Sequence, residues 1–113
     1  MDDKVLIRID SIIKNIDEVS NDLRNVDYIA FCESTLLPRA ISFSIALIAE
    51  QMIRLEEKIG DSYKEIPWTS ARGMRNLIVH EYDSVDFVEV YHTATVDLPI
   101  LKDQFLKIRN EIV

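Results

Sequence analysis

Apolar residues recur at helical spacing near both ends of the chain. Near the N-terminus they are three or four positions apart, with charged residues between them, at Val5, Ile9, Ile12, Ile16, Val19 and Leu23. Near the C-terminus the same spacing recurs at Leu98, Leu101, Phe105, Ile108 and Ile112. Because an α-helix has about 3.6 residues per turn, this spacing places each set on one helix face. The pattern predicts two amphipathic helices, each with one face in the core.

The middle of the chain predicts a longer and more apolar helix. Residues 40–49 read AISFSIALIA, which is apolar on nearly every side of a helix. Ser34 or Thr35 can cap this helix, and Gly60 can end it just after Ile59. We therefore expect a helix from this cap to about Ile59 that is central in the fold and the most buried of all.

A third helix is expected between Ile66 and His80. Pro67 suits its first turn, where the backbone N–H groups have no partner within the helix. The later boundaries are expected at a loop over Glu81–Val85, a fourth helix from the capping pair Asp86 and Glu89, and a break and restart at Asp97 and Pro99. Four or five helices with short connections predict an all-α, antiparallel bundle in a single domain, residues 1–113.

Composition restricts the classes of protein to which the chain can belong. Two glycines leave little room for the turns of an all-β fold. The single Cys32 excludes an intramolecular disulfide, and the histidines lack the spacing of metal ligands, so we expect neither a metal nor another cofactor. The longest apolar run, residues 40–49, is too short to span a membrane, and the N-terminus lacks a signal peptide. A soluble, cytoplasmic protein is therefore expected.

Charge is distributed unevenly along the sequence. The net charge is −7, and a uniformly acidic surface would repel nucleic acid, so binding RNA would require a local basic patch. Residues 66–80 contain no acidic residue, in a chain with 20 of them. On a helical projection Arg72, Asn76 and His80 form a stripe opposite the apolar face, and Arg75 flanks that stripe. This segment is the predicted basic patch.

These residue types suit the cleavage of RNA without a metal ion. An imidazole titrates near neutral pH, so His80 can take the proton from a ribose 2′-OH or give one to the leaving oxygen. Arg75 can stabilise the charge that builds on the phosphate, and Asn76 can orient the histidine or hold a phosphate oxygen. Arg72 can help position the substrate or be an ordinary surface residue. DNA lacks the 2′-OH and would not be cut.

The spacing of the two central residues raises a geometric difficulty. Arg75 and His80 are about 140° apart around an ideal helix, so one straight helix presents them poorly to a single substrate. Either the helix unwinds near His80, or two copies of the chain face each other and share their residues. We favour the homodimer. On spacing alone a plainer interpretation also stands, namely an exposed helix face that ends in a histidine favoured by the helix dipole.

The motif is accompanied by further matches along most of the chain. Arg75, Asn76, His80 and Tyr82 fit the pattern R-N-x-x-x-H-x-Y. The other matching stretches are Arg39-Ala40, Ile48-Ala49-Glu50, Ile66-Pro67-Trp68, Gly73-Met74, Val85-Asp86 and Asp97-Leu98-Pro99. Together they resemble the HepT-like HEPN-domain toxins. Ala49 stands where that family commonly has glycine, at a position that is expected to pack helices.

The resemblance implies a HEPN helical bundle that forms a homodimer and acts as a metal-independent endoribonuclease toxin. It also implies a partner, a minimal nucleotidyltransferase antitoxin. The resemblance assigns catalysis to Arg75 and His80, gives Asn76 its place in the motif, and makes Tyr82 the residue to which the antitoxin can transfer AMP. An added AMP would bring negative charge and bulk into the cleft where phosphate must lie.

Other interpretations of the same residues stay open. Tyr82 can instead be an aromatic residue that packs on the end of the bundle. The chain can be a non-catalytic helical module that only docks a nucleotidyltransferase. We expect Trp68 to anchor the core rather than to stack on a base, and His92 to lie on the surface or in an interface.

Overall fold

The structure is a computed structural model that describes residues 3–113, and α-helices make up most of that range. They are α1 Asp3–Asp22, α2 Tyr28–Glu33, α3 Leu37–Ile59, α4 Trp68–His80, α5 Phe87–His92 and α6 Leu98–Ile112. Short 3₁₀ turns follow α3 and α4, at Gly60–Ser62 and Tyr82–Ser84, and a π-helical turn, Thr93–Asp97, joins α5 to α6. The prediction of an all-α fold is confirmed.

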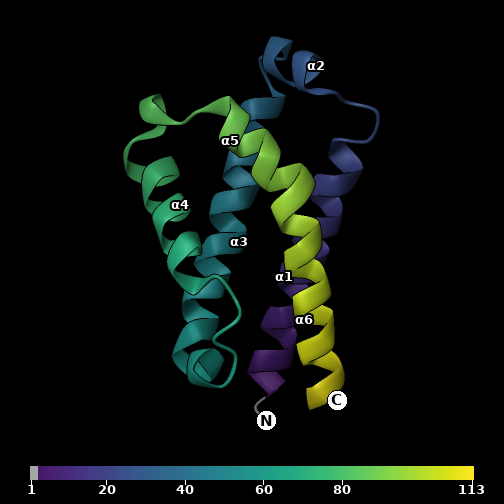
Figure 1. The fold of residues 1–113 in the computed structure, drawn as a ribbon, viewed down its shortest axis with the longest axis vertical. Coiled ribbons are helices and arrows are strands. Elements are labelled where there is room, and N and C mark those ends of the chain that lie inside the picture. The colour runs from purple at the N-terminus through teal and green to yellow at the C-terminus, as the bar shows by residue number, and fades with distance from the viewer. Residues whose placement is uncertain (1–2) are drawn as a thin grey trace.

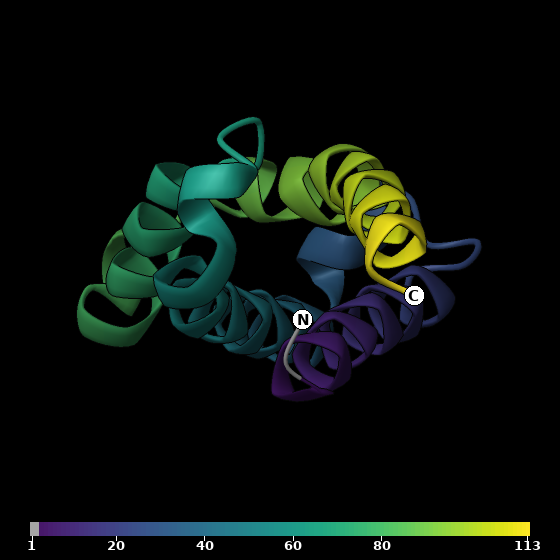
Figure 2. The same cartoon turned by 90° about the horizontal axis from the view of Figure 1, so that it is seen from below.

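The four long helices lie side by side around a common interior (Figures 1 and 2). α3 packs against α1 and α4, and α1 packs against α6. α1 and α4 run in one direction and α3 and α6 in the other, so both ends of the chain lie at the same end of the bundle. The predicted antiparallel bundle is therefore confirmed. None of the helices within residues 3–113 combines the length and the apolar character that crossing a membrane requires.

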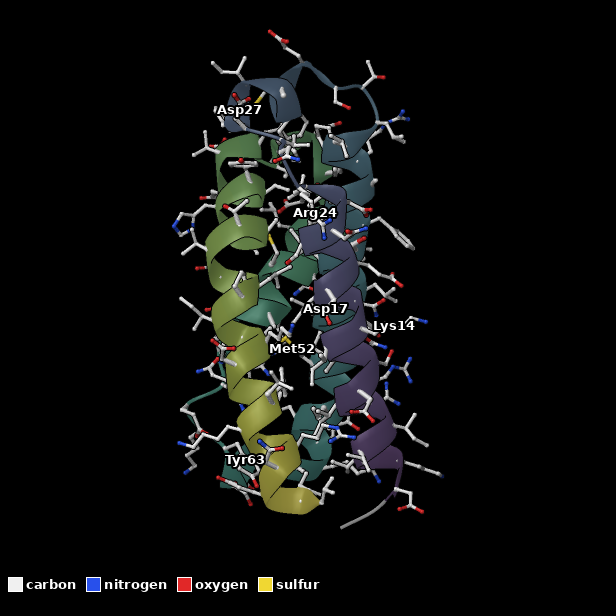
Figure 3. All side chains as sticks on the ribbon, turned by 90° about the vertical axis from the view of Figure 1, so that its right-hand side faces the viewer. Lys14, Asp17, Arg24, Asp27, Met52 and Tyr63 are labelled. Atoms are coloured by element: carbon white, nitrogen blue, oxygen red, sulfur yellow. The ribbon has the colours of Figure 1, made fainter. Side chains whose placement is uncertain are left out.

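The core is built from the apolar stripes that the spacing predicts. On α1 the stripe residues are at most 3% exposed: Val5, Ile9, Ile12, Ile16 and Val19. The α6 stripe is buried at Leu98, Leu101, Phe105 and Ile108. Figure 3 shows an exposed and a buried side chain of the bundle. Lys14 points from α1 into solvent, whereas Met52 of α3 lies between the helices.

The ends of α3 follow the predicted signals. The N-cap of α3 is Leu36, which has no side-chain cap of its own, but the hydroxyl of the predicted Ser34 accepts hydrogen bonds from the backbone N–H groups of Leu36 and Leu37, at 3.2 and 2.9 Å. Gly60 is the C-cap, with a right-handed φ of −56°. A Cβ atom at Gly60 would lie 2.7 Å from the Cγ of Glu56, so the close approach of that side chain favours glycine here.

α3 has more buried residues than any other helix within residues 3–113, as expected, but one of its apolar faces is open. Ile41, Ile45 and Ile48 point into the core, but Phe43 is 68% exposed and Leu47 is 41% exposed. The reason is the place of α3 in the bundle, because its neighbours α1 and α4 cover only its inner side. Composition alone does not distinguish an apolar face that meets the core from one that stays open.

The short helix α2 was not predicted. Its six residues are too few to show a helical period, and only Phe31 is fully buried. It begins where the Asp27 carboxylate accepts a hydrogen bond from the N–H of Ala30 at 2.8 Å. The turn before it contains Asn25 with a φ of 62°, a left-handed conformation that asparagine tolerates better than most residues.

At the expected break, Asp97 and Pro99, the chain instead stays helical, because a π-helical turn connects α5 directly to α6 (Figure 1). The N–H of Leu98 bonds to the carbonyl of Thr93, five residues earlier. Proline lacks an N–H group and crowds the carbonyl four residues before it, and a wider turn relieves both problems. Of the predicted capping pair, Asp86 is confirmed as the N-cap of α5, because its carboxylate accepts a hydrogen bond from the N–H of Val88 at 2.9 Å.

Candidate active site

Trp68 fixes the rotation of α4 about its own axis. Its ring is buried and meets Phe105 of α6 edge-on, and its Nε1–H donates to the carbonyl of Tyr63 at 3.0 Å. Ile78 is buried further along the same helix. The expected role of Trp68 as a core anchor is confirmed. With these residues facing inward, the polar residues of the motif are left on the outer sides of α4.

A pocket of about 630 Å³ opens between α3 and the second half of α4. Three of the predicted site residues line it, namely Arg75, His80 and Tyr82. The other residues around it are Arg39, Ser42, Phe43, Ala46, Leu47, Glu50, Ile78 and Val79. The helices therefore bring the arginine and the histidine of the motif to one cavity within a single copy of the chain.

α4 stays helical to His80, so unwinding is not what brings the two residues together. His80 is the last helical residue and is exposed at the pocket. Arg75 instead extends toward α3, where its Nη1 group forms an ion pair with Glu50. Both residues therefore line one pocket, although they are about 140° apart around an ideal helix.

Asn76 reaches the site through Arg75. Its side-chain oxygen accepts a hydrogen bond from the Nε–H of Arg75 at 2.8 Å. Asn76 does not itself line the pocket, in contrast to the expectation that it contacts the histidine or a phosphate oxygen. In this structure its visible contact is with the arginine.

Arg72 lies outside the pocket. Its guanidinium pairs with Glu56 of α3, and its Nη2 donates to the Thr69 hydroxyl at 3.1 Å. Residues 66–80 contain no acidic residue, but in the folded chain both Arg72 and Arg75 form ion pairs with glutamates of α3. The local positive charge is thus lower than the sequence suggests. Sequence reasoning missed these pairs, since they depend on how two helices dock.

Tyr82 packs on the end of the bundle as well as lining the pocket. Its ring is half-buried against the core, and its hydroxyl oxygen is buried with no hydrogen-bond partner among the described residues. The hydroxyl of Ser42, which lines the same pocket, is in the same situation. An unpaired buried hydroxyl costs free energy, so two such groups in one pocket are notable.

The remaining candidates lie away from this pocket. His92 is exposed on α5, as expected, and its Nδ1 lies 3.6 Å from the Asp97 carboxylate. Ala49 is buried where α3 meets α4, which agrees with the helix-packing role expected for it. Within residues 3–113 no three His, Cys, Asp or Glu side chains gather closely enough to hold a metal ion.

Fold and site together define a small helical protein with an arginine- and histidine-lined pocket, and comparisons with known proteins give its family. The family model described as "Ribonuclease HepT-like" matches residues 9–108. The protein named "Putative RNase MJ1216" of Methanocaldococcus jannaschii is 29% identical over 101 residues, which cover 89% of this chain and 84% of the relative. "Probable ribonuclease HepT" of Thermococcus cleftensis is 29% identical over 82 residues, covering 69% and 74%. No solved structure matches the chain. The chain belongs to the HepT-like ribonuclease family.

Proposed function

We propose that the chain is the ribonuclease toxin of a toxin–antitoxin pair and that it cuts RNA in the pocket between α3 and α4. The observation that carries this proposal is that Arg75 and His80 line the same cavity. Membership of the HepT-like ribonuclease family supports the activity. The substrate is RNA and not DNA, because the reaction needs the ribose 2′-OH as its nucleophile.

The chemistry follows from the two side chains. The 2′-oxygen attacks the phosphorus, the bond from phosphorus to the 5′-oxygen breaks, and a 2′,3′-cyclic phosphate forms. His80 accepts the proton from the 2′-OH or supplies one to the 5′-oxygen. Arg75 binds the phosphate oxygens and stabilises the added negative charge of the transition state. Asn76 contributes by holding the Nε–H of Arg75. No step requires a metal ion.

A second copy of the chain would complete the site. Phe43, Leu47 and Val79 form an apolar rim around the pocket and are between 41% and 68% exposed. Exposed apolar residues that gather in this way are typical of an interface. A twofold contact through this apolar rim would bring two sets of Arg75 and His80 together. One His80 could then accept a proton while the other donates one.

Control by a nucleotidyltransferase antitoxin is proposed to act at Tyr82. A phenol is a poor base at neutral pH, so Tyr82 is better suited to regulation than to proton transfer. Because its hydroxyl is buried, AMP transfer requires the turn Tyr82–Ser84 to open first. Once attached, AMP would fill the pocket with bulk and negative charge and would exclude the RNA phosphate.

The decisive test is cleavage of defined RNAs by the purified chain in the presence of EDTA. Wild type should cut, and His80→Ala and Arg75→Ala should each lose on the order of 100-fold or more in rate. His92→Ala is the matched control, because it removes an exposed histidine outside the pocket and should leave the rate unchanged. Strict dependence on Mg²⁺, or full activity of His80→Ala, would contradict the proposal.

The apolar rim also favours a second candidate function, in which the chain docks a nucleotidyltransferase without catalysis. Expression in cells separates the two functions. A ribonuclease should arrest growth, and His80→Ala should abolish that arrest. A docking module should bind its partner equally well with histidine or alanine at position 80, and it should not arrest growth.

A further inference from the structure

Two glutamate–arginine pairs join α3 to α4, which lie side by side in Figure 1. Glu50 pairs with Arg75, and Glu56 pairs with Arg72. In each pair the glutamate comes from α3 and the arginine from α4. Only the Glu50–Arg75 pair lines the pocket. The two pairs therefore share a structural role, and any catalytic role belongs to one of them alone.

The contacts of Arg75 fix where its guanidinium group lies. A guanidinium has five N–H donors. The Nε–H donates to Asn76, and an Nη1–H donates to Glu50. These two hydrogen bonds leave three N–H donors of Arg75 unused, namely the two on Nη2 and the second one on Nη1. These remaining donors are enough to bind two phosphate oxygens side by side.

Glu50 is itself held from a second direction. One of its carboxylate oxygens contacts Arg75, and the other lies 3.8 Å from the Nη2 of Arg54, one turn along α3. The Arg75 side chain is only 28% exposed, whereas that of Arg54 is 62% exposed. The carboxylate therefore bridges an inner arginine at the pocket and an outer one at the surface.

We propose that Glu50 is a positioning residue of the ribonuclease site, an inference that rests on the proposed function. Its carboxylate holds Arg75 in the orientation in which the free N–H groups face the pocket. It does not touch the substrate. Without this contact the guanidinium of Arg75 would be held only by the side chain of Asn76, and the Arg75 side chain would sample other rotamers. Misplacement of a catalytic group by about 1 Å can cost on the order of 100-fold in rate.

The negative charge of Glu50 has a second consequence. It lies beside the group that binds phosphate, so it weakens the attraction of the site for RNA in the ground state. Glu50 should thus lower the affinity for RNA while it raises turnover. A residue that only braces two helices would not produce these opposite effects on KM and kcat.

The first test measures kcat and KM for wild type, Glu50→Gln, Glu50→Ala and Glu56→Ala on one short RNA in EDTA. Glu50→Gln keeps an acceptor for Arg75 and loses the charge, so we expect kcat close to wild type and KM lower by several-fold. Glu50→Ala should lose about tenfold or more in kcat, again without a rise in KM. Glu56→Ala, the matched control, should leave both constants unchanged.

The second test needs no RNA. In ¹⁵N relaxation of the arginine Nε–H groups, Glu50→Ala should increase the motion of Arg75 and leave Arg72 unchanged, and Glu56→Ala should do the reverse. Equal kinetics for the two alanine variants, or no change at Arg75, would overturn the role of Glu50. A wild-type chain that does not cut RNA would overturn the proposed function instead, and the relaxation measurement would still decide whether Glu50 orders Arg75.

Discussion

Replacing Tyr82 with phenylalanine should stabilise the fold, although most substitutions in a packed site are destabilising. The Tyr82 hydroxyl is buried and has no hydrogen-bond partner among the described residues, while the ring packs against the core. Tyr82→Phe keeps the ring and removes only the unpaired group. An unpaired buried polar group costs about 1–3 kcal/mol, and we expect a gain near the lower end because Tyr82 is only half-buried.

A gain of about 1 kcal/mol corresponds to a rise in Tm of about 4 °C for a chain of this length. Thermal unfolding followed by circular dichroism, at one fixed protein concentration, measures this shift. Tyr91→Phe is the matched control, because the Tyr91 hydroxyl donates to the carbonyl of Val26 at 2.7 Å. The same chemical change should therefore lower Tm there by a similar amount. If Tyr82→Phe lowers Tm as Tyr91→Phe does, the Tyr82 hydroxyl is hydrogen-bonded in solution and the reasoning is refuted.

Three further predictions concern assembly and control. If one composite site uses both His80 side chains, an equal mixture of wild type and His80→Ala should keep about a quarter of the activity of the same total amount of wild type after subunit exchange. Sites confined to one chain would keep about half. Phe43→Asp should shift the protein to monomers in sedimentation, and an unchanged dimer would remove the apolar rim from the interface. Tyr82→Phe should keep most of its ribonuclease activity and escape AMP transfer. Mass spectrometry after co-expression with the nucleotidyltransferase checks this, and an AMP adduct on another residue would show that Tyr82 is not the target.

The helices could be predicted because their apolar residues recur at one spacing. Ile9 and Ile16 on α1 are buried, as this spacing requires. Short elements give no such signal, so α2 was missed. The π-helical turn was also missed, since Pro99 indicates that an ordinary helix cannot continue but does not say how the chain adapts.

Sequence reasoning selected residues that the structure brings to one pocket, but it could not predict their surroundings. Arg75 and His80 are only five positions apart in the sequence and belong to a recognisable motif, and they line one pocket. The partners of the arginines come from another helix, so the ion pair with Glu50 depends on the packing of α3 against α4. The exposure of Phe43 likewise depends on which side of α3 has neighbours. Local spacing contains neither piece of information.

The proposal that RNA is cut by its own 2′-OH, without a metal ion, is tested most directly with a single modified substrate. The purified chain is incubated in EDTA with an RNA whose ribose at the mapped cleavage position carries a 2′-methoxy group, beside the unmodified RNA. The proposal predicts cleavage of the unmodified RNA to a 2′,3′-cyclic phosphate or its hydrolysis product, and no cleavage at the methoxy position. Continued cutting at that position would contradict it.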